Sequence, residues 1–521
     1  MKTLFKPILG ISMLAVSLSA SAQLSSTVTV DLANEGNLIP KEIYGQFSEH
    51  LGQCIYGGLW VGENSQIPNE KGYRKDVLQA LKDLHVPVLR WPGGCFADEY
   101  HWMDGIGPKE KRPTMVNNNW GGTVEDNSFG THEFLNLCEM LGCEPYISGN
   151  VGSGTVEELA KWVEYMTSDG NSPMANLRRQ NGREKPWKVK FLGVGNESWG
   201  CGGSMRPEYY SDLYRRYSTY CREYDGNKLY KVASGASDYD YNWTRVCMKA
   251  IGNRMNAISL HYYSVINGWD GSKGSATDFT TAEYLRTLSK CREVEEVIQK
   301  HIAIMDELDP KNHIDLLLDE WGTWWDVAEG TNPGWLFQQN TMRDALVASL
   351  SFDIFHKYTR RLKMANIAQI VNVLQSMILT DQKGQGHMVL TPTYHVFKMY
   401  NVHQDATFIP LDILCDKVST EGNRTLPMLS ATASKDKNGI LHLSVTNTAP
   451  DKTQTVKLNI PGLKAKTVTG EILNGKFMGS YNTFENPDDV KPVPFNGAKV
   501  KKGEVELTLP AHSIVTIEVK P

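Results

Sequence analysis

Short apolar runs alternate with longer stretches of helical periodicity between residues 41 and 400, and this pattern limits the possible folds most strongly. We expect eight strands, at residues 43–48, 87–91, 144–148, 189–194, 231–234, 257–260, 314–318 and 367–374. The stretches between them carry helix signals, such as the apolar face of Val77, Leu78 and Leu81 and the capping box that begins at Thr155. Because repeated units of one strand and one helix close into a barrel, we predict a (β/α)8 TIM barrel over residues 41–400.

The pattern changes after about residue 400. Apolar and polar residues alternate at 441–445, 456–460 and 505–509, and Asn438-Gly439 is a hairpin signal. This alternation predicts an antiparallel β-sandwich of jelly-roll type over residues 401–521. Residues 27–31 alternate in the same way, so we expect the segment 23–40 to add a strand to the sandwich.

The N-terminus carries the features of an export signal. Lys2 and Lys6 precede an apolar run at 8–18, and small residues follow at 19–22. Together they predict a signal peptide at residues 1–22 and a secreted or periplasmic protein. The run is too short to span a bilayer, and no later run reaches the roughly 20 apolar residues that a spanning helix needs.

Charge and cysteine usage exclude several classes of partner and site. The formal net charge is -5, and acidic and basic residues are mixed, so nucleic acid or anionic lipid is not an expected partner. The nine cysteines are odd in number and resemble no compact disulfide framework, so we expect most of them to be buried thiols. The sequence shows no metal-ligand cluster and no nucleotide-binding loop, so no metal and no cofactor are expected.

Polar and aromatic residues follow most of the predicted strands. In such a barrel the residues just beyond the carboxyl ends of the strands share one cleft. These residues are Glu49, His50, residues 90–95, Asn150, Asn196, Glu197, residues 261–263, residues 319–321 and Gln375. Most are acidic, aromatic or able to bind a hydroxyl group, which indicates a carbohydrate substrate.

Two glutamates among them suit glycoside hydrolysis. Glu197 follows Asn196 at the fourth strand and Glu320 ends the seventh, and these strands lie nearly opposite each other in a barrel. Hydrolysis with retention needs two carboxyl groups about 5 to 5.5 Å apart. Because like charges that close cannot easily both ionise, we expect Glu197 to stay protonated and Glu320 to be the nucleophile. A single glutamate after an apolar run is usually only a solvated strand end or a helix cap.

Long motifs at these positions are specific for one family. They lie at residues 43–50, 90–102, 120–122, 130–134, 195–197, 261–263 and 319–321. In these motifs the sequence resembles the α-L-arabinofuranosidases of glycoside hydrolase family 51, and the resemblance covers nearly the whole mature chain. It implies an exo-acting, retaining enzyme that releases terminal arabinofuranosyl groups from arabinan, arabinoxylan or derived oligosaccharides. It also implies a homo-oligomer, commonly a hexamer built from dimers.

The resemblance assigns roles residue by residue. Glu197 is the acid/base and Glu320 the nucleophile that forms the covalent glycosyl-enzyme. The residues that hydrogen-bond the furanose are Glu49, Cys95, Asn196, Tyr263 and Gln375. Arg90 and His261 orient the carboxylates, and Trp120 and Trp324 form walls for the substrate.

Each role has a plainer alternative. Arg90 could be a structural ion-pair partner, Cys95 a buried thiol, and Gln375 a cap on the barrel, while Trp120 and Trp324 could be ordinary packing. The sequence departs from the family's commonest wording at Gln46 and at residues 322–325, which leaves the aglycone side open. An endo-β-1,4-glucanase or a xylanase or xylosidase that uses the same two glutamates is one alternative function, and a catalytically silent carbohydrate-binding protein is another.

Overall fold

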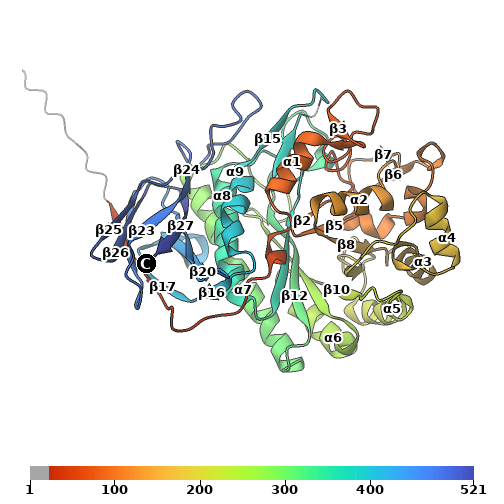
Figure 1. Cartoon of the computed structure of the whole chain (residues 1–521), viewed down its shortest axis with the longest axis horizontal. Coiled ribbons are helices and arrows are strands. Elements are labelled where there is room, and N and C mark those ends of the chain that lie inside the picture. Colours follow the sequence, from red (N-terminus) through yellow and green to blue (C-terminus); the bar gives the residue numbers. More distant parts are fainter. Residues whose placement is uncertain (1–22, 382) are drawn as a thin grey trace, which may run out of the picture.

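The computed structural model describes residues 23–381 and 383–521, so the predicted signal peptide at 1–22 lies outside the described residues. Within this part the chain forms a barrel, seen on the right of Figure 1, and a β-sandwich on the left. The predicted fold class is therefore confirmed. The domain boundaries near residues 40 and 400 stay a prediction.

Eight parallel strands close the barrel in the described chain, in the order β10-β11-β12-β13-β2-β5-β8-β9. Their bounds are β2 (Gly45–Phe47), β5 (Val88–Trp91), β8 (Glu144–Gly149), β9 (Phe191–Val194), β10 (Tyr230–Ser237), β11 (Ala257–Ser264), β12 (Asp315–Thr323) and β13 (Leu362–Ala368). Seven of them overlap the predicted runs closely. All eight carboxyl ends meet at one rim, which is where a barrel builds its active site.

The eighth strand is the exception, because its predicted position at 367–374 is wrong. The observed strand β13 carries Lys363 and Asn366, which interrupt its apolar pattern. The apolar residues Ile370, Val371 and Val373 that suggested the strand are also buried, but they belong to the segment that follows it. The buried irregular segment after β13 has the same apolar pattern as a buried strand. Periodicity alone cannot distinguish the two.

Helices cover the outside of the barrel. They are α1 (Lys75–Asp83), α2 (Thr131–Leu141), α3 (Val156–Thr167), α4 (Pro173–Gln180), α5 (Pro207–Tyr220), α6 (Tyr241–Ile251), α7 (Thr281–Leu308), α8 (Met342–Phe355) and α9 (Pro392–Tyr400). Thr155 caps α3 by accepting a hydrogen bond from the Glu158 backbone N–H, as predicted. Every residue of α8 is buried, because this helix lies between the barrel and the sandwich. There Ser430 of the sandwich donates a 2.6 Å hydrogen bond to Asp353 of α8.

The sandwich consists of two sheets. One has the order β17-β1-β22-β26-β25 and the other β16-β20-β21-β27-β23-β24. Their bounds are β1 (Leu24–Val30), β16 (Thr407–Ile409), β17 (Leu411–Leu414), β20 (Leu429–Lys435), β21 (Leu441–Asn447), β22 (Gln454–Asn459), β23 (Thr467–Leu473), β24 (Val493–Pro494), β25 (Ala498–Lys501), β26 (Glu504–Leu509) and β27 (Ser513–Lys520). Buried residues such as Val28, Val445, Val456 and Leu507 fill the space between the sheets.

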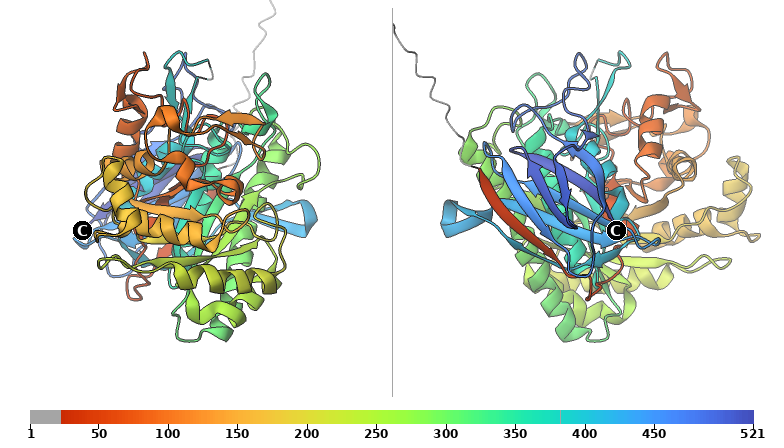
Figure 2. Two further views of the ribbon diagram at one scale, coloured as in Figure 1. Left: turned by 90° about the vertical axis from the view of Figure 1, so that its right-hand side faces the viewer. Right: turned by 60° about the vertical axis from the view of Figure 1, so that its left-hand side comes forward.

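The N-terminal strand joins this sandwich, as expected. Strand β1 pairs antiparallel with β17 and parallel with β22, and the right view of Figure 2 shows it in red among the blue strands of the sheet. All other pairings in the two sheets are antiparallel. The predicted hairpin at Asn438-Gly439 links β20 to β21, and Gly439 has the positive φ of 79° that such a turn favours.

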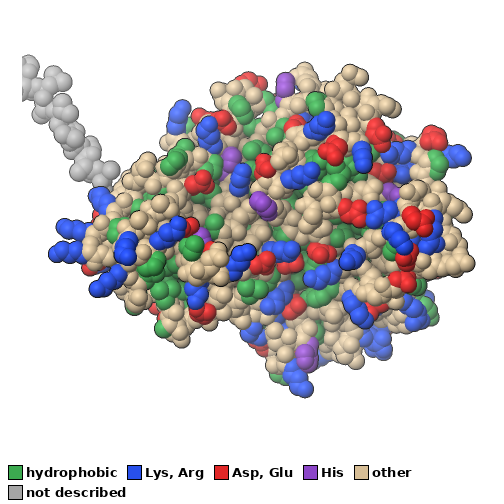
Figure 3. Space-filling view, viewed as in Figure 1, with side chains coloured by type: hydrophobic (Ala, Val, Ile, Leu, Met, Phe, Trp, Pro, Cys, Tyr) green, Lys and Arg blue, Asp and Glu red, His purple; other side chains and the backbone are tan. Residues whose placement is uncertain are grey.

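The surface carries charges of both signs. On the face drawn in Figure 3, lysine and arginine side chains are interspersed with aspartate and glutamate. None of the helices in the described ranges has both the length and the apolar character that crossing a bilayer requires.

Candidate active site

A cavity of about 390 Å³ opens at the carboxyl ends of the barrel strands. It is lined by Phe47, Glu49, Leu51, Gly94, Cys95, Trp120, Glu197, Trp199, Ser237, Asp238, Tyr263, Trp269, Glu320, Trp324, Leu336, Gln369 and Leu374. Seven predicted site residues are among them. The cavity combines carboxyl groups with four indole rings, which suits a sugar because its ring carries both hydroxyl groups and apolar C–H faces.

The two predicted catalytic glutamates meet across this cavity. One oxygen of Glu197, one oxygen of Glu320 and a ring nitrogen of His261 all lie within 4.8 Å of one another. Glu320 sits within strand β12, whereas Glu197 lies in the turn after β9 with a φ of 38°. A non-glycine residue in this left-handed region is strained, and such strain is common where a side chain must be aimed at a reaction centre.

Glu320 is surrounded by donors. Arg90 Nη1 donates to its Oε1 at 2.8 Å and the Tyr263 hydroxyl donates to its Oε2 at 2.9 Å. Burial raises the pKa of Glu320, while the positive charges of His261 and Arg90 act against that rise. Hydrogen bonds to the charged form stabilise it, so this environment suits an ionised nucleophile.

His261 and Asp319 tie the two glutamates together. His261 Nδ1 lies 2.8 Å from Glu197 Oε1, and Nε2 lies 2.9 Å from Asp319 Oδ1. Burial acts to lower the pKa of His261, but Glu320, Asp319 and Glu197 together raise it to about 10. His261 is therefore an imidazolium at neutral pH that fixes the orientation of Glu197.

Arg90 is buried and shared between several groups. Its Nη2 donates to Asn196 Oδ1 at 2.6 Å, and its guanidinium lies 4.5 Å from the centre of the Phe47 ring. Burial acts to lower the pKa of Arg90, but Asp319 and Glu320 raise it above its usual range. Arg90 thus stays charged and holds both Glu320 and Asn196 in place.

Glu49 forms another wall of the cavity. Its Oε1 accepts hydrogen bonds from the backbone of Gly94 and Phe96 and from Trp120 Nε1, each at 3.0 Å. Gln369 Nε2 donates to Glu49 Oε2 at 3.1 Å. Burial, together with the nearby Glu320, raises the pKa of Glu49 to about 7 despite these donors.

Asn196 has an unpaired hydrogen-bond donor beside the cavity. Its Nδ2 is buried and has no hydrogen-bond partner among the described residues. A Cβ atom added to Gly94 would lie 2.7 Å from Glu320 Oε1 and 3.5 Å from this Nδ2. The space beside Gly94 thus adjoins both groups, and an unpaired buried donor there is costly unless a ligand satisfies it.

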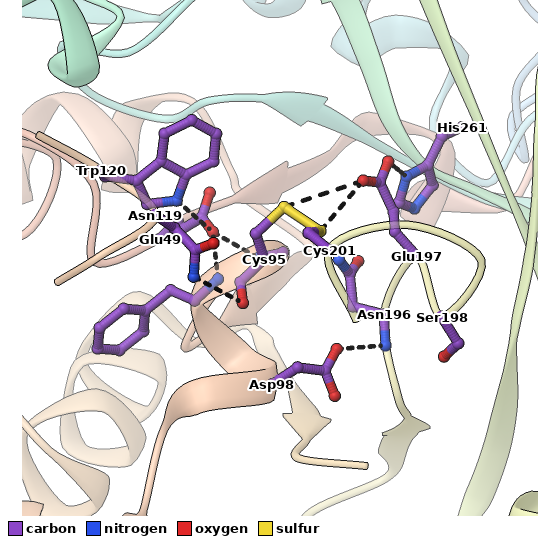
Figure 4. Close-up of a disulfide and its surroundings, with 12 residues drawn as sticks. Glu49, Cys95, Asp98, Asn119, Trp120, Asn196, Glu197, Ser198, Cys201 and His261 are labelled. Carbon is purple, nitrogen blue, oxygen red and sulfur yellow. Dashed lines mark hydrogen bonds and ion pairs between the residues drawn. A yellow bond between two sulfur atoms is a disulfide. The ribbon is translucent and has the colours of Figure 1, made fainter. Parts of the chain in front are cut away.

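Cys95 does line the cavity, but the expectation of a free thiol is wrong. It forms a disulfide with Cys201, which lies 106 residues away in the sequence. Figure 4 shows this bond beside the Glu197 carboxylate. The remaining cysteines of the described chain are free, and all except Cys415 are buried, as predicted for most of them.

Gln375 does not stand where the sequence placed it. Its Oε1 accepts from the Thr323 backbone, and its Nε2 donates to Asp344 O and Thr393 Oγ1. The side chain is fully buried and does not line the cavity. The error follows from the misplaced eighth strand, since the residue directly after the true strand end is Gln369, which does line the cavity.

Sequence reasoning missed three further contributors. Asp98 is buried and accepts backbone hydrogen bonds from Val151, Gly152 and Asn196, and burial raises its pKa to about 7. Trp199 and Trp269 add two walls of the cavity, and Trp269 is 48% exposed. The sequence did offer a signal for the two tryptophans, since each lies in a loop that follows a barrel strand.

Comparisons with known proteins agree with this geometry. Two family models match the chain, the α-L-arabinofuranosidase 1 domain over residues 80–276 and the α-L-arabinofuranosidase C-terminal domain over residues 319–513. A protein of Bacteroides ovatus named intracellular exo-α-L-arabinofuranosidase is 69% identical over 515 residues, which cover 99% of each chain.

The name of that relative contradicts the predicted location. The sequence predicted a secreted or periplasmic protein with a signal peptide, whereas a relative matched over 99% of its length is named intracellular. The prediction rested on a compositional pattern in residues 1–22, which lie outside the described part of the chain. The prediction of a secreted or periplasmic location is therefore wrong.

Solved structures extend the match to three dimensions. The family 51 arabinofuranosidase of Xanthomonas axonopodis pv. citri is 49% identical, with a TM-score of 0.93, over 96% of this chain and 100% of its own. The α-L-arabinofuranosidase of Thermotoga maritima, solved as an arabinose complex, is 31% identical, with a TM-score of 0.81, over 95% of this chain and 100% of its own. With the cavity, the paired glutamates and these matches in place, the chain belongs to glycoside hydrolase family 51, the α-L-arabinofuranosidase family.

Proposed function

We propose that the protein is an exo-acting α-L-arabinofuranosidase that retains the configuration of the sugar. The observation that carries the mechanism is the meeting of Glu197 and Glu320 within 4.8 Å. That spacing suits a direct attack by one carboxylate, because an inverting enzyme would need about 6.5 to 9.5 Å to admit a water molecule between the two.

The two carboxyl groups have different environments, and we assign them different catalytic roles. Glu320, held by Arg90 and Tyr263, attacks the anomeric carbon and forms the covalent glycosyl-enzyme. Glu197 donates its proton to the leaving oxygen and then, as a base, takes a proton from the attacking water.

The proposed sugar-binding roles rest on polar groups that face the cavity and on its tryptophan rings. Asn196 Nδ2 is free to bind a sugar hydroxyl, and Glu49 and Tyr263 face the same cavity. Trp120 and Trp324 supply apolar walls, and Gln369 replaces Gln375 in our proposal for the furanose contacts. Cys95 takes part through its disulfide rather than through a thiol.

The name of the Bacteroides ovatus relative, an exo-α-L-arabinofuranosidase, supports exo action. The cavity of about 390 Å³ has room for a terminal arabinofuranosyl group. The substrates we propose are therefore arabinan, arabinoxylan and the oligosaccharides derived from them. The name of the Bacteroides ovatus relative favours action inside the cell, and assembly into a homo-oligomer stays a prediction.

Product analysis tests this function. The protein is incubated with arabinan and arabinoxylan oligosaccharides, and the products are followed by chromatography and by NMR of the first anomer formed. We expect free arabinose that appears first as the α-anomer. Fragments from internal cleavage without free arabinose, or the β-anomer as first product, would contradict the proposal.

A further inference from the structure

The disulfide ties the loop that carries Glu197 to a neighbouring segment. Cys95 begins the short 3-10 helix η2 (Cys95–Glu99), which follows strand β5, and Cys201 lies shortly after Glu197. A second tie runs beside the first, since Asp98 of η2 accepts a 3.1 Å hydrogen bond from the Asn196 backbone N–H. Figure 4 shows both ties on the same side of Glu197. The loop therefore keeps one anchor even if the disulfide opens.

The two oxygens of Glu197 have different neighbours. Oε1 lies 2.8 Å from His261 Nδ1, whereas Oε2 lies 3.5 Å from the Cys201 sulfur and 3.9 Å from the Cys95 sulfur. Because Oε1 is engaged with His261, Oε2 is the oxygen left to exchange a proton with the substrate. The two sulfur atoms thus flank the working oxygen of the proposed acid/base.

This sulfur pair is accessible, unlike most cysteines of the described chain. Cys201 is exposed and Cys95 is half-buried, whereas Cys54 and Cys247 are examples of thiols that are fully buried. Burial raises the pKa of each of these two thiols to about 12, so they are poor nucleophiles and poor metal ligands at neutral pH. Because Cys201 is exposed, a small reductant can reach the disulfide from solvent.

Three potential ligand atoms lie close together beside the disulfide. The sulfur atoms of Cys95 and Cys201 and an oxygen of Glu197 all lie within 4.8 Å of one another. Zn²⁺ takes thiolate sulfur at about 2.3 Å and carboxylate oxygen at about 2.0 to 2.2 Å, usually in a tetrahedron. The neighbouring group of Glu197, His261 and Glu320 has similar spacing, but both ring nitrogens of His261 are already occupied by carboxylates. A cation therefore depends on the two sulfur atoms.

We propose that the Cys95–Cys201 pair, once reduced, forms with Glu197 a binding site for a thiophilic divalent cation such as Zn²⁺ or Cd²⁺. A dithiol supplies the two electrons and two protons that open the disulfide, and it is itself oxidised to a disulfide. The cation then displaces the two thiol protons and the proton on Glu197 Oε2 to solvent, and it binds the two thiolates and this oxygen, leaving a fourth position for water. In the oxidised protein the sulfur atoms are bonded to each other and cannot serve as thiolate ligands.

Occupation of this site blocks the proposed reaction. A cation on Oε2 takes the lone pair that must carry the proton to the leaving oxygen, so the acid/base is lost. This consequence rests on the proposed function of Glu197, whereas the cation site itself does not. Oxidation would protect the enzyme from inhibition by metal, and reduction would expose it.

Cadmium titration tests the site without relying on activity. The full chain is reduced with a dithiol, freed of reductant without air, and titrated with Cd²⁺ while thiolate-to-cadmium absorption is recorded. The untreated, oxidised protein is titrated in parallel. The free thiols are the same in both states, so the difference between the titrations isolates the pair, and we expect one Cd²⁺ per chain in that difference.

Activity supplies the second arm of the test. Zn²⁺ should compete with an aryl α-L-arabinofuranoside in the reduced protein and lower its hydrolysis about tenfold when free Zn²⁺ is about ten times its dissociation constant. A chelator should restore the rate, and the oxidised protein should be unaffected at the same Zn²⁺ concentration. Cys415→Ser is the matched control, since Cys415 is a partly exposed free cysteine of the sandwich, and it should keep both effects.

Two variants test whether both cysteines are ligands of the cation. Cys201→Ser and Cys95→Ser each remove one ligand, and each is compared with its own metal-free rate after its fold is checked by circular dichroism. We expect both to lose the absorption of the paired site. The proposal is overturned by equal cadmium absorption in the oxidised and reduced proteins, or by its persistence in either variant. If the protein proves inactive on arabinofuranosides but still binds cadmium on reduction, only the proposed function fails.

Discussion

The two glutamates of the active site are held in different ways. Glu320 lies inside barrel strand β12, and the side chains of Arg90 and Tyr263 donate to it from other strands. Glu197 lies in a turn, and its loop is tied down by a disulfide and by Asp98. The barrel itself thus positions the proposed nucleophile, whereas the disulfide and Asp98 position the proposed acid/base. Removal of a strand-borne group should therefore abolish the chemistry, and changes on the loop side should have graded effects.

The largest effect is expected from the strand side. Glu320→Gln keeps the shape of the side chain but removes the nucleophile, so kcat/KM for an aryl α-L-arabinofuranoside should fall roughly 10⁴-fold or more. The measurement is steady-state hydrolysis, with Glu329→Gln on the exposed surface as the control. A loss of less than about tenfold would show that another group makes the attack.

Glu197→Ala should give a smaller loss that depends on the leaving group. Poor leaving groups need the proton, so their hydrolysis should slow by roughly 10² to 10⁴-fold, whereas an activated aryl group should be affected much less at the glycosylation step. Azide should restore turnover by attacking the glycosyl-enzyme without a base. Equal losses for all leaving groups and no effect of azide would remove Glu197 from this role.

Gly94→Ala tests the space between strand β12, which carries Glu320, and the loop that carries Glu197. The new Cβ would come within 2.7 Å of Glu320 Oε1, so either the carboxylate or the loop must move. A misplacement of about 1 Å at a reaction centre can cost about 10²-fold in rate, and we expect a loss of that order in kcat/KM. Gly170→Ala is the control, because the nearest atom to its new Cβ would be 3.6 Å away. Unchanged kinetics of Gly94→Ala would contradict the close packing.

His261 contacts both Glu197 and Glu320. Its positive charge should make the free energy of unfolding depend on pH. Its folded pKa of about 10 lies above the ordinary value of 6.5, so the stabilisation is complete below about pH 6.5. It is lost as the pH rises through about 10. The difference in unfolding free energy between the wild type and His261→Gln should thus shrink by on the order of 2 kcal/mol between pH 6 and pH 10. Denaturant titrations at the two pH values measure it, and a constant difference would mean that His261 is not charged.

The smallest effect is expected from the aromatic wall of the cavity. The Trp324 ring lies 5.3 Å from that of Tyr263 and 5.4 Å from that of Trp269, and Trp269 is the more exposed. Trp269→Ala should raise KM for arabino-oligosaccharides by about three- to tenfold with little change for a small aryl arabinoside. An equal change for both substrates would place this ring at the furanose rather than at the aglycone.

The sequence predicted the strand-borne half of the site better than the loop-borne half. Glu320, Tyr263, Arg90 and His261 could be placed because each lies on a barrel strand with a clear apolar run, and strand ends share one rim. Glu197 was found by the same rule. The (β/α)8 barrel and the β-sandwich followed from periodicity, since the two patterns differ so strongly on either side of residue 400.

The features that the sequence did not reveal depend on contacts between distant residues. Nothing in the spacing of Cys95 and Cys201 distinguishes them from the other cysteines, since pairing across 106 residues depends on how two loops meet. Asp98 accepts backbone hydrogen bonds from distant segments, which leave no local pattern. Gln369 was missed because buried residues after the eighth strand looked like the strand itself.

Trapping the glycosyl-enzyme tests the central claim most directly. The Glu197→Ala variant is mixed with an activated aryl α-L-arabinofuranoside, quenched in acid, digested and analysed by peptide mass spectrometry. We predict one pentosyl group on the peptide that contains Glu320, because that carboxylate attacks while the base for its release is missing. A pentosyl group on Glu49 or on any other residue, or turnover with no adduct under any quench time, would contradict the account.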